Sequence, residues 1–397
     1  MTKPILIAGG GLASLLFARA LHRAKIPFLV FERDASIVFR AQGYRLRLSS
    51  LGLDAIESVL GPEGFQKFYA KCGKTGGAGF VAVDPFTGET GETLGGGPPA
   101  VSNQPLLSRD GKVVGISRGD MRSLFLEGLE DRVRWSHQVA GYELTGDGVR
   151  VVFEDGTKSE EGSMLVGGEG VKSKVSKQLS GGRIKVYDIG VRFIHGQAPT
   201  TAFKGLGEGV FAITDEKSHP GGKVFVITNV RPEEMNDPNV QFGWTLGGSP
   251  GVIKAPNDDY TIIGKPAAEI AKSLTAGWHE RLKPLFDEMV ESEAAFWKIT
   301  CSSPDGVPEW PNEPRVTVLG DAVHGMTPAG GNGANTALRD SALLGRLIVE
   351  AGGYKEGITE AYEKEMRVYA SEAVRKSYEI AQKTFGSNKI DSSTPTL

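Results

Sequence analysis

Cysteine, long apolar runs and net charge are all scarce in this sequence. Its only cysteines, Cys72 and Cys301, lie far apart and outside any CxxC spacing. This argues against a disulfide framework and a zinc site, and it favours a reducing, cytoplasmic setting. No stretch reaches the roughly 18 apolar residues that a membrane span needs. The formal net charge of −3 gives no basic surface for nucleic acid or membrane. Six histidines show no metal-ligand spacing, so we predict no metal site.

Glycine, in contrast, is abundant. The chain holds 54 glycines in 397 residues, about twice the usual share of roughly 7%. They gather in discrete loops rather than repeats, which indicates backbone requirements and not low complexity. The length predicts two to three domains, and 40% hydrophobic residues suit an ordinary globular core.

The first glycine loop lies between predicted elements of a βαβ unit. Pro4 to Ala8 is a short apolar run typical of a buried strand, Leu12 to Ala24 has apolar residues at helical spacing, and Phe28 to Phe31 is a second apolar run. Such a crossover makes the two strands parallel.

Residues of this loop fit a dinucleotide site. Gly9 and Gly11 occupy the first two positions of GxGxxG, and Ser14 occupies the third. The first glycine allows a tight turn, and the second lets the backbone of Leu12 and its neighbours approach a pyrophosphate at the helix N-terminus. Glu32, 23 residues after Gly9, is placed to accept hydrogen bonds from ribose hydroxyls. This signature does not separate NAD from FAD.

A second glycine loop comes late in the chain. Arg315 to Leu319, "RVTVL", predicts a strand that ends at Gly320 and Asp321. The Asp321 carboxylate is suited to a polyol such as a ribityl chain. "PAGGNGAN", Pro328 to Asn335, brings bare backbone N–H groups to a helix start near Ala334. Two separated helix ends of this kind suit one long cofactor, FAD rather than NAD.

Three motifs together resemble the single-component FAD-dependent aromatic hydroxylases, the para-hydroxybenzoate hydroxylase family of group A flavoprotein monooxygenases. They are "GGGLAS…FERD", "SMLVGGEGVKSKV" (Ser163 to Val175) and "LGDAVHGMTPAGGNGANTAL", in that order over nearly the whole length. The shorter salicylate hydroxylase and tetracycline-degrading members are the most similar. Two departures stand out: Glu169 replaces the usual aspartate of the middle motif, and Gly325 replaces a common proline.

The resemblance implies a set of FAD contacts. Glu32 would meet the adenosine ribose, Arg40 the pyrophosphate, and Asp321 the ribityl and pyrophosphate region. Arg118 would reach the cofactor from a helix start, although a surface residue or cap is the alternative. The full set is Gly9, Gly11, Leu12, Ala13, Ser14, Glu32, Arg33, Arg40, Arg118, Glu169, Gly170, Gly320, Asp321, Pro328, Gly331, Gly333, Ala334 and Asn335. His324 is structural in this interpretation.

The stretch between the middle and last motifs alternates like antiparallel strands, and the resemblance implies that this sheet forms the substrate pocket. Arg192 lies between Val191 and Phe193. A matching arginine in some fungal flavin monooxygenases acts on the substrate, so we predict a catalytic role with a solvated strand face as the alternative. Arg45 and Arg47 share one face of "YRLRL" and would favour an anionic substrate, unless they are plain surface residues. Phe211, Phe225 and Trp244 complete the pocket candidates.

The predicted fold is α/β: a Rossmann-like FAD-binding domain interleaved with a substrate domain on a mostly antiparallel sheet, followed by long C-terminal helices. We expect the FAD-binding domain in residues 1–76, 106–180 and 276–385, the last part including the C-terminal helices. A substrate-domain hairpin is expected in 77–105, the substrate-binding sheet in 181–275, and a flexible tail in 386–397.

The implied activity is that of an FAD-dependent monooxygenase. Non-covalent FAD, with NADPH or NADH and O2, would hydroxylate or epoxidise an aromatic or alkene-containing small molecule through a flavin C4a-hydroperoxide. The fungal resemblance suggests secondary metabolism. A flavin-dependent reductase or dehydrogenase on the same fold, or a non-catalytic flavin-binding protein, remains the alternative. We expect a monomer or homodimer.

Overall fold

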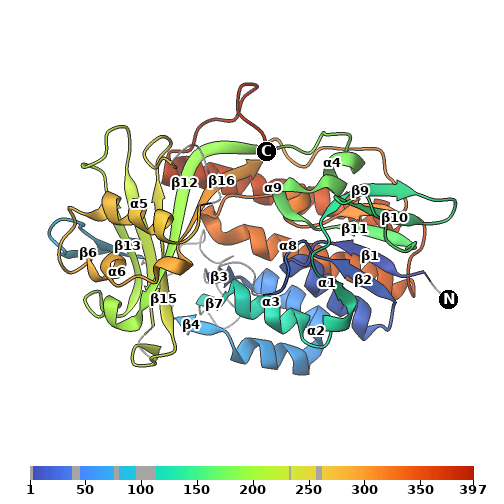
Figure 1. Ribbon diagram of the computed structural model, residues 1–397, viewed down its shortest axis with the longest axis horizontal. Coiled ribbons are helices and arrows are strands. Elements are labelled where there is room, and N and C mark those ends of the chain that lie inside the picture. Colours follow the sequence, from blue (N-terminus) through green and yellow to red (C-terminus); the bar gives the residue numbers. More distant parts are fainter. Residues whose placement is uncertain (1–2, 38–44, 76–79, 95–112, 232–233, 256–261) are drawn as a thin grey trace.

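The computed structural model describes residues 3–37, 45–75, 80–94, 113–231, 234–255 and 262–397. It has two main parts, shown side by side in Figure 1. A parallel sheet surrounded by long helices lies on the right, and a large mixed sheet with two short helices lies on the left. A small three-stranded sheet lies between them. Among the described residues, no helix combines the length and apolar character needed to span a membrane.

The parallel sheet is built from the apolar runs that the sequence predicts as strands. Its order is β17-β11-β1-β2-β8, and every pairing is parallel. All residues of its first four strands in this order are buried, as expected for strands covered on both faces. The bounds are β1 Ile5–Ala8, β2 Phe28–Phe31, β8 Val133–Arg134, β11 Met164–Gly167 and β17 Val316–Val318. The Rossmann-like prediction is confirmed.

Two helices that begin at the glycine loops, α1 (Leu12–Arg23) and α8 (Asn332–Glu350), pack directly on each other. A Cβ atom at Gly345 of α8 would lie 2.8 Å from the Cβ of Ala20 in α1, so glycine is what permits the close approach. The Ser341 hydroxyl also donates to the carbonyl of Ala13 at 2.8 Å. The starts of the two helices are thereby held in a fixed relation.

The remaining helices cover the two sheets. They are α2 Ser50–Ala70, α3 Arg118–Leu126, α4 Lys174–Leu179, α5 Lys265–Thr275, α6 Pro284–Asp287, α7 Asp321–His324 and the long C-terminal α9 Ile358–Phe385. Helix α2 is kinked at Gly61, which has a φ of 73° and is followed by Pro62. Short 3₁₀ turns follow Leu129, Glu169, Pro199, Val290 and Pro328.

The large sheet has seven strands in the order β16-β12-β15-β14-β13-β5-β6. All its pairings are antiparallel except that of β13 with β5, which confirms the predicted mostly antiparallel sheet. The bounds are β5 Phe80–Val83, β6 Thr90–Leu94, β12 Val186–Pro199, β13 Gly209–Asp215, β14 Val224–Val230, β15 Gln241–Gly248 and β16 Ala295–Ser302.

The two faces of this sheet pack differently. The outer face carries Phe211, Val226 and Trp244 into a core shared with α5 and α6. The inner face carries Phe193 and Phe225 into a smaller cluster with α9 and with Ala329, which precedes α8; Ile227, Trp297 and Met326 pack against that cluster. The inner face therefore meets the start of the α8 helix.

Between the two parts lies the sheet β3-β7-β4, with bounds Arg45–Leu48, Val113–Ser117 and Gly73–Thr75. Both of its pairings are antiparallel. In Figure 1 its strands lie near the centre of the molecule, and β7 leads directly into α3. The end of β3 also contacts the start of α8, because the Arg47 carbonyl accepts a hydrogen bond from Asn335.

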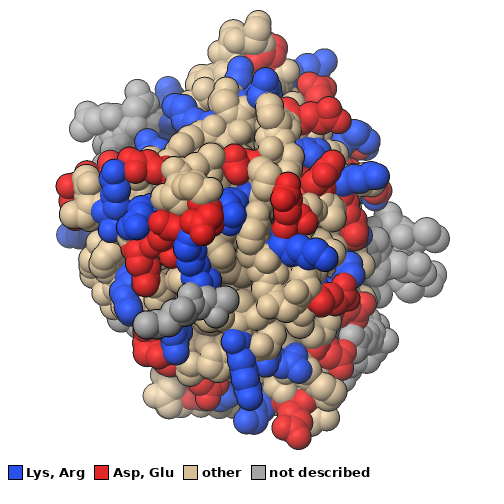
Figure 2. Space-filling model, turned by 90° about the vertical axis from the view of Figure 1, so that its right-hand side faces the viewer, with Lys and Arg blue, Asp and Glu red and all other residues tan. Residues whose placement is uncertain are grey.

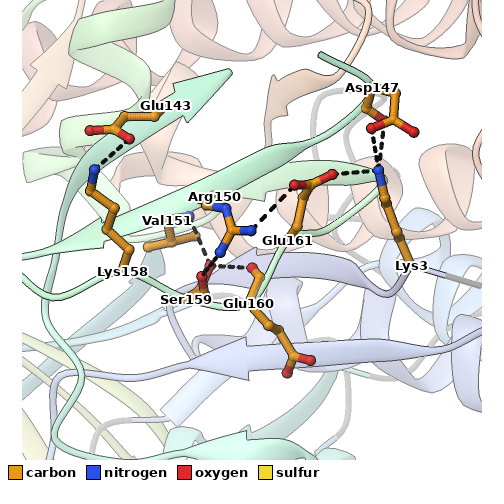
Figure 3. Close-up of polar contacts among 9 residues, drawn as sticks. All are labelled: Lys3, Glu143, Asp147, Arg150, Val151, Lys158, Ser159, Glu160 and Glu161. Carbon is orange, nitrogen blue, oxygen red and sulfur yellow. Dashed lines mark hydrogen bonds and ion pairs between the residues drawn. The ribbon is translucent and has the colours of Figure 1, made fainter. Parts of the chain in front are cut away.

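A hairpin of β9 (Val139–Leu144) and β10 (Val149–Phe153) is tied to the N-terminal strand by charged groups (Figure 3). The Lys3 ammonium lies between Asp147, at 2.5 Å, and Glu161, which also binds Arg150 at 3.3 Å. These groups are at the surface, so they fix the hairpin's position more than they add stability. On the face shown in Figure 2, acidic and basic side chains intermingle.

The structure corrects two predicted boundaries. Strand β16 pairs with β12, so the large sheet continues past residue 275, where the sequence interpretation ended it. The polar tail also packs back on the sheet. Asn388 donates its N–H to the Ile189 carbonyl and Leu397 donates to the Val186 carbonyl. Backbone pairing with the first residues of β12, which β15 does not cover, needs no apolar side chains, and this is why composition alone predicts a free tail.

Candidate functional site

The first part of the site is the start of α1. Gly9 has a φ of +89°, and a Cβ there would lie 2.6 Å from the Gly168 carbonyl oxygen, so only glycine fits. Gly11 is the N-cap residue of α1 and has no side-chain cap, and the first helical turn holds no acidic residue. A Cβ on Gly11 would meet only the Gly168 oxygen at 3.9 Å. The helix thus presents unshielded N–H groups, with room for an anion.

Glu32 lies directly beside this helix start. Its carboxylate is buried and accepts hydrogen bonds from the backbone N–H of Gly10 at 2.5 Å and of Asp34 at 2.9 Å. This agrees with the predicted position at the end of β2. Ser14, at the third position of the motif, is buried against Gly168, so its small side chain serves helix packing. Leu12 and Ala13 are half-buried at the helix start, and Arg33 is exposed.

Sequence reasoning missed Arg122, which holds the first glycine loop. Its guanidinium is almost completely buried, and its Nε donates to the Gly10 carbonyl at 2.9 Å. The other nitrogens lie 3.5 Å from Glu32 and 3.4 Å from Asp34. Burial lowers the pKa of Arg122, while both carboxylates act against this effect. The available signal was its position four residues after Arg118, on the buried face of α3.

The second part of the site is the start of α8. Gly331, its N-cap residue, is left-handed with a φ of 64°, and the helix has neither a side-chain cap nor an acidic residue in its first turn. Pro328 is exposed, and Gly333 and Ala334 are half-exposed. A Cβ on Gly333 would meet only the Met326 Cβ at 3.9 Å. This helix start is therefore as open as that of α1.

Asp321 begins α7 immediately after Gly320, whose φ of 62° turns the chain at the end of β17. Its side chain is exposed to solvent, yet the pKa of its carboxyl is raised by desolvation from the protein around it. Because water reaches the group, we regard it as a carboxylate on an open surface rather than an enclosed acid. Arg118 and His324 favour its charged form, so Arg118 lies within electrostatic reach of Asp321.

Asn335 uses its side chain in a way the sequence did not indicate. Its Oδ1 accepts the N–H of Ser49 at 2.9 Å, and its Nδ2 donates to the carbonyls of Arg47 at 3.0 Å and Gly331 at 2.8 Å. The amide therefore fastens the end of β3 to the start of α8. Its predicted backbone contact with a flavin stays a prediction.

His324 belongs to a buried network beneath the site. Its Nε2 lies 2.6 Å from Oδ2 of Asp340, which also accepts the Gly320 N–H at 2.7 Å, while Oδ1 of Asp340 accepts the Tyr369 hydroxyl at 2.6 Å. Both His324 and Asp340 are fully buried. The network anchors the turn that carries Asp321, in keeping with a structural role for His324.

This network leads us to expect a pH-dependent stability difference between the wild type and His324→Gln. Desolvation opposes the charged imidazole, but Asp340 outweighs it and raises the pKa of His324 above its usual 6.5. The stabilisation is therefore complete below about pH 6.5 and is lost as the pH rises through the folded-state pKa. Urea unfolding of both proteins between pH 6 and 9 measures it. A difference that stays constant or grows with pH contradicts this assignment.

Glu169 turns its carboxylate toward its own segment. It accepts the Ser173 hydroxyl at 2.7 Å and the Val175 N–H at 3.1 Å, and so helps to cap α4. The following Gly170 has a φ of +79°. Gly325 also has a packing reason: a Cβ there would lie 2.8 Å from Cγ1 of Val171. The two departures in the motifs therefore lie at one interface, between α7 and the turn after Glu169.

The inner face of the seven-stranded sheet forms the wall opposite α8. Ile227, Thr245 and Trp297 are half-exposed there, although the residue before each of them, which faces the outer core, is buried. Phe225, a predicted pocket residue, lies on this face but is only 5% exposed, because the Phe385 ring of α9 stacks on it at 5.2 Å between ring centroids. Its contact with a substrate stays a prediction. A partly open face beside an uncapped helix start is suited to an organic ligand.

Three other candidates lie on the outer face, which argues against the roles predicted for them. Phe211 and Trp244 are buried in the core under α5 and α6. Arg192 shares a cross-strand row with Val224 of that core, and it binds Asp188 through two nitrogens, at 2.7 and 2.9 Å. The predicted alternation, which places Arg192 on the opposite face from Val191 and Phe193, is correct. Only strand pairing shows which of the two faces meets α8.

Trp244→Phe is accordingly expected to affect folding and not the site. The indole N–H donates to the Leu285 carbonyl at 2.8 Å, and the ring is 1% exposed. Loss of this bond and of ring volume should lower the free energy of unfolding by about 2–3 kcal/mol, measured by chemical denaturation. Cofactor affinity should be unchanged. Unchanged stability together with altered ligand binding would contradict this assignment and indicate that Trp244 lines the pocket.

Comparison with known proteins identifies the family. A family model described as the FAD binding domain matches residues 126–377. The chain belongs to this FAD-binding family. The matched region contains Glu169, Asp321 and the α8 start, while the α1 loop of this FAD-binding protein lies outside it.

Its relatives include named monooxygenases. It is 30% identical over 392 residues to the dual O-methyltransferase/FAD-dependent monooxygenase elcB of Phaeosphaeria nodorum, covering 89% of this chain and 41% of the relative. The chain thus spans under half of that protein's length. It is 27% identical over 409 residues to the FAD-dependent monooxygenase vrtH of Penicillium aethiopicum, covering 95% and 91%.

The fold is shared with a solved structure, Klebsiella pneumoniae HpxO complexed with FAD and uric acid. The TM-score is 0.72 at 19% identity, covering 96% of this chain and 89% of that one. Two of the predicted site residues of this FAD-binding protein have no described side chain. Arg40 lies outside the described residues, and for Arg45 only the backbone, in β3, is described.

Proposed function

We propose that this FAD-binding protein is a monooxygenase that uses NADPH or NADH and O2 to hydroxylate or epoxidise an aromatic or alkene-containing small molecule. The observation that carries the proposal is the junction of the uncapped α8 start with a half-exposed sheet face. Ala329, just before α8, packs in one cluster with Phe193 and Phe225 of that face. A flavin at the helix start would therefore face a substrate on the sheet.

The residues present fit FAD at both helix starts. The uncapped α1 start offers N–H groups, with free space at Gly11, for a pyrophosphate, and Glu32 offers a carboxylate for ribose hydroxyls. Asp321 is exposed, and its carboxylate suits the ribityl hydroxyls. Arg118 lies within electrostatic reach of this carboxylate. When bound, FAD accepts a hydride from reduced nicotinamide and supports insertion of one atom of O2 into a substrate, the other leaving as water.

The protein's own contribution is placement and exclusion of water. The unshielded N–H groups of α8 favour negative charge on a group at the helix start. The apolar inner face, where Ile227 and Trp297 are half-exposed, gives a dry surface on which an aromatic or alkene group can be held. The names of elcB and vrtH support oxygenation as the activity.

The first experiment is an anaerobic spectrum followed by a labelled turnover. Purified protein, supplied with FAD if needed, should show the oxidised flavin band near about 450 nm, and NADPH or NADH should bleach it. With ¹⁸O2 and a panel of aromatic and alkene compounds, one labelled atom should enter the product. Bleaching with transfer of electrons to an organic acceptor, and no label in any product, would favour a reductase. A protein that binds no flavin contradicts the proposal.

Two broader expectations accompany this function. We propose a cytoplasmic location, supported by the sparse and separated cysteines, and a monomer or homodimer in solution. Size-exclusion chromatography with light scattering measures the second directly.

A further inference from the structure

Arg47, in β3, is a half-buried arginine that has no counter-ion among the described residues. Its Nε is buried and has no hydrogen-bond partner, and within the described part of the chain no ion pair reaches its guanidinium. Burial lowers the pKa of Arg47, and no acidic group in the described ranges acts against this effect. At Arg122, in contrast, the carboxylates of Glu32 and Asp34 act against the lowering of the pKa by burial. A desolvated cation without a partner is costly, unless a ligand supplies the anion.

The backbone of β3 directs Arg47 away from the core. Leu48 is buried in the main core and Leu46 packs against it, so the alternation of the strand places Arg47 on the other face. Its partner across the ladder is Gly115, whose own partner is Gly73. This row has no side chain to cover the guanidinium, because both neighbours are glycines.

Arg47 is also fixed at the start of α8. Asn335 binds the Arg47 carbonyl at 3.0 Å, and a Cβ on Gly331 would lie 3.9 Å from the Arg47 Cβ. Gly331 follows Ala329, which packs with Phe193 of the inner face. Arg47 therefore lies at the start of α8, close to where that helix start meets the inner face of the seven-stranded sheet. The start of α8 adds a positive electrostatic potential of its own.

We propose that Arg47 binds an anionic group of the substrate, a carboxylate or phenolate, and so restricts the substrate class of this site to aromatic or alkene-containing anions. The planar guanidinium can hold two oxygens at once, which orients the ligand as well as attracting it. The inference rests on the proposed function for the identity of the ligand as substrate.

Paired probes test the charge preference. Protein loaded with FAD is titrated with 2-hydroxybenzoate and with 2-hydroxybenzamide, its neutral counterpart, and the flavin absorbance is followed. We expect the anion to bind the wild type at least about tenfold more tightly than the amide. In Arg47→Met this preference should fall to about twofold or less, and Arg47→Lys should keep part of it.

Lys74→Met is the matched control. Lys74 is exposed on β4 of the same small sheet, where it lies over the Tyr69 ring, so this variant removes a nearby positive charge without touching Arg47. It should retain the wild-type preference. Equal loss in both variants would indicate general attraction rather than a site, and an unchanged preference in Arg47→Met would overturn the proposal.

Iodide is a second probe that needs neither turnover nor a matching shape. Crystals of the protein soaked in iodide should show anomalous density at the Arg47 guanidinium in the wild type and none there in Arg47→Met. Iodide found only elsewhere, or Arg47 paired with a protein carboxylate, overturns the proposal even if neither aromatic probe binds. Because this readout does not depend on flavin reduction, failure of the proposed function is distinguished from failure of the anion site.

Discussion

Gly11→Ala is expected to weaken FAD binding by about 10- to 100-fold while leaving the apoprotein folded. A Cβ at this position meets only the Gly168 oxygen, at 3.9 Å, so the apoprotein can accommodate it. A pyrophosphate at the α1 start has to approach the same backbone, and the methyl group would stand in its way. A loss of this size corresponds to about 1.4–2.7 kcal/mol of binding free energy. Titration of apoprotein with FAD measures it.

The control for this prediction is Gly277→Ala. Gly277 is exposed after α5, and a Cβ at this position would have no atom within 4 Å, so the same change there should leave FAD affinity intact. Alanine is a poorer N-cap than glycine, and Gly11→Ala should therefore also lower apoprotein stability by up to about 1 kcal/mol. Tight FAD binding by Gly11→Ala would remove the α1 start from the cofactor site.

Arg122→Leu is expected to lower the free energy of unfolding by about 3–5 kcal/mol. The arginine is 2% exposed and stands between the Gly10 carbonyl and the carboxylates of Glu32 and Asp34. Its removal leaves buried negative charge without a partner, which is the costly way to break such a group. Chemical denaturation of the apoprotein measures the loss. FAD affinity should fall as well, because Gly10 and Glu32 are no longer held together.

Arg132→Leu provides the comparison. Arg132 pairs with Asp131 at 3.2 Å, but both side chains are at least half exposed, so its loss should change stability by no more than about 1 kcal/mol. Arg122→Lys should recover part of the stability, since a single ammonium can reach one acceptor at a time. Equal stability of the Arg122 and Arg132 variants would contradict the buried network.

The sequence by itself determined the elements and the loops of this protein. Apolar runs such as Ile5–Ala8 and Phe28–Phe31 became strands where the pattern indicated them, because a strand buried on both faces requires continuous apolar residues. Gly9 and Gly320 were recognised for the same kind of reason. Their positive φ values are a local backbone demand that glycine alone meets without strain.

The tertiary structure alone decided which side chains share a site. The sequence indicated alternation around Arg192 and in "YRLRL", yet strand pairing turned Arg192 and Trp244 toward the outer core and placed Arg47 beside Gly115, on the face of β3 away from the main core. Arg122 and the side-chain role of Asn335 were missed because their partners, Gly10 and Arg47, are 112 and 288 residues away. Hydrophobic periodicity and glycine content are local properties of a chain. Which face a strand buries, and which residue pairs with a charged side chain, depend on segments that only folding brings together.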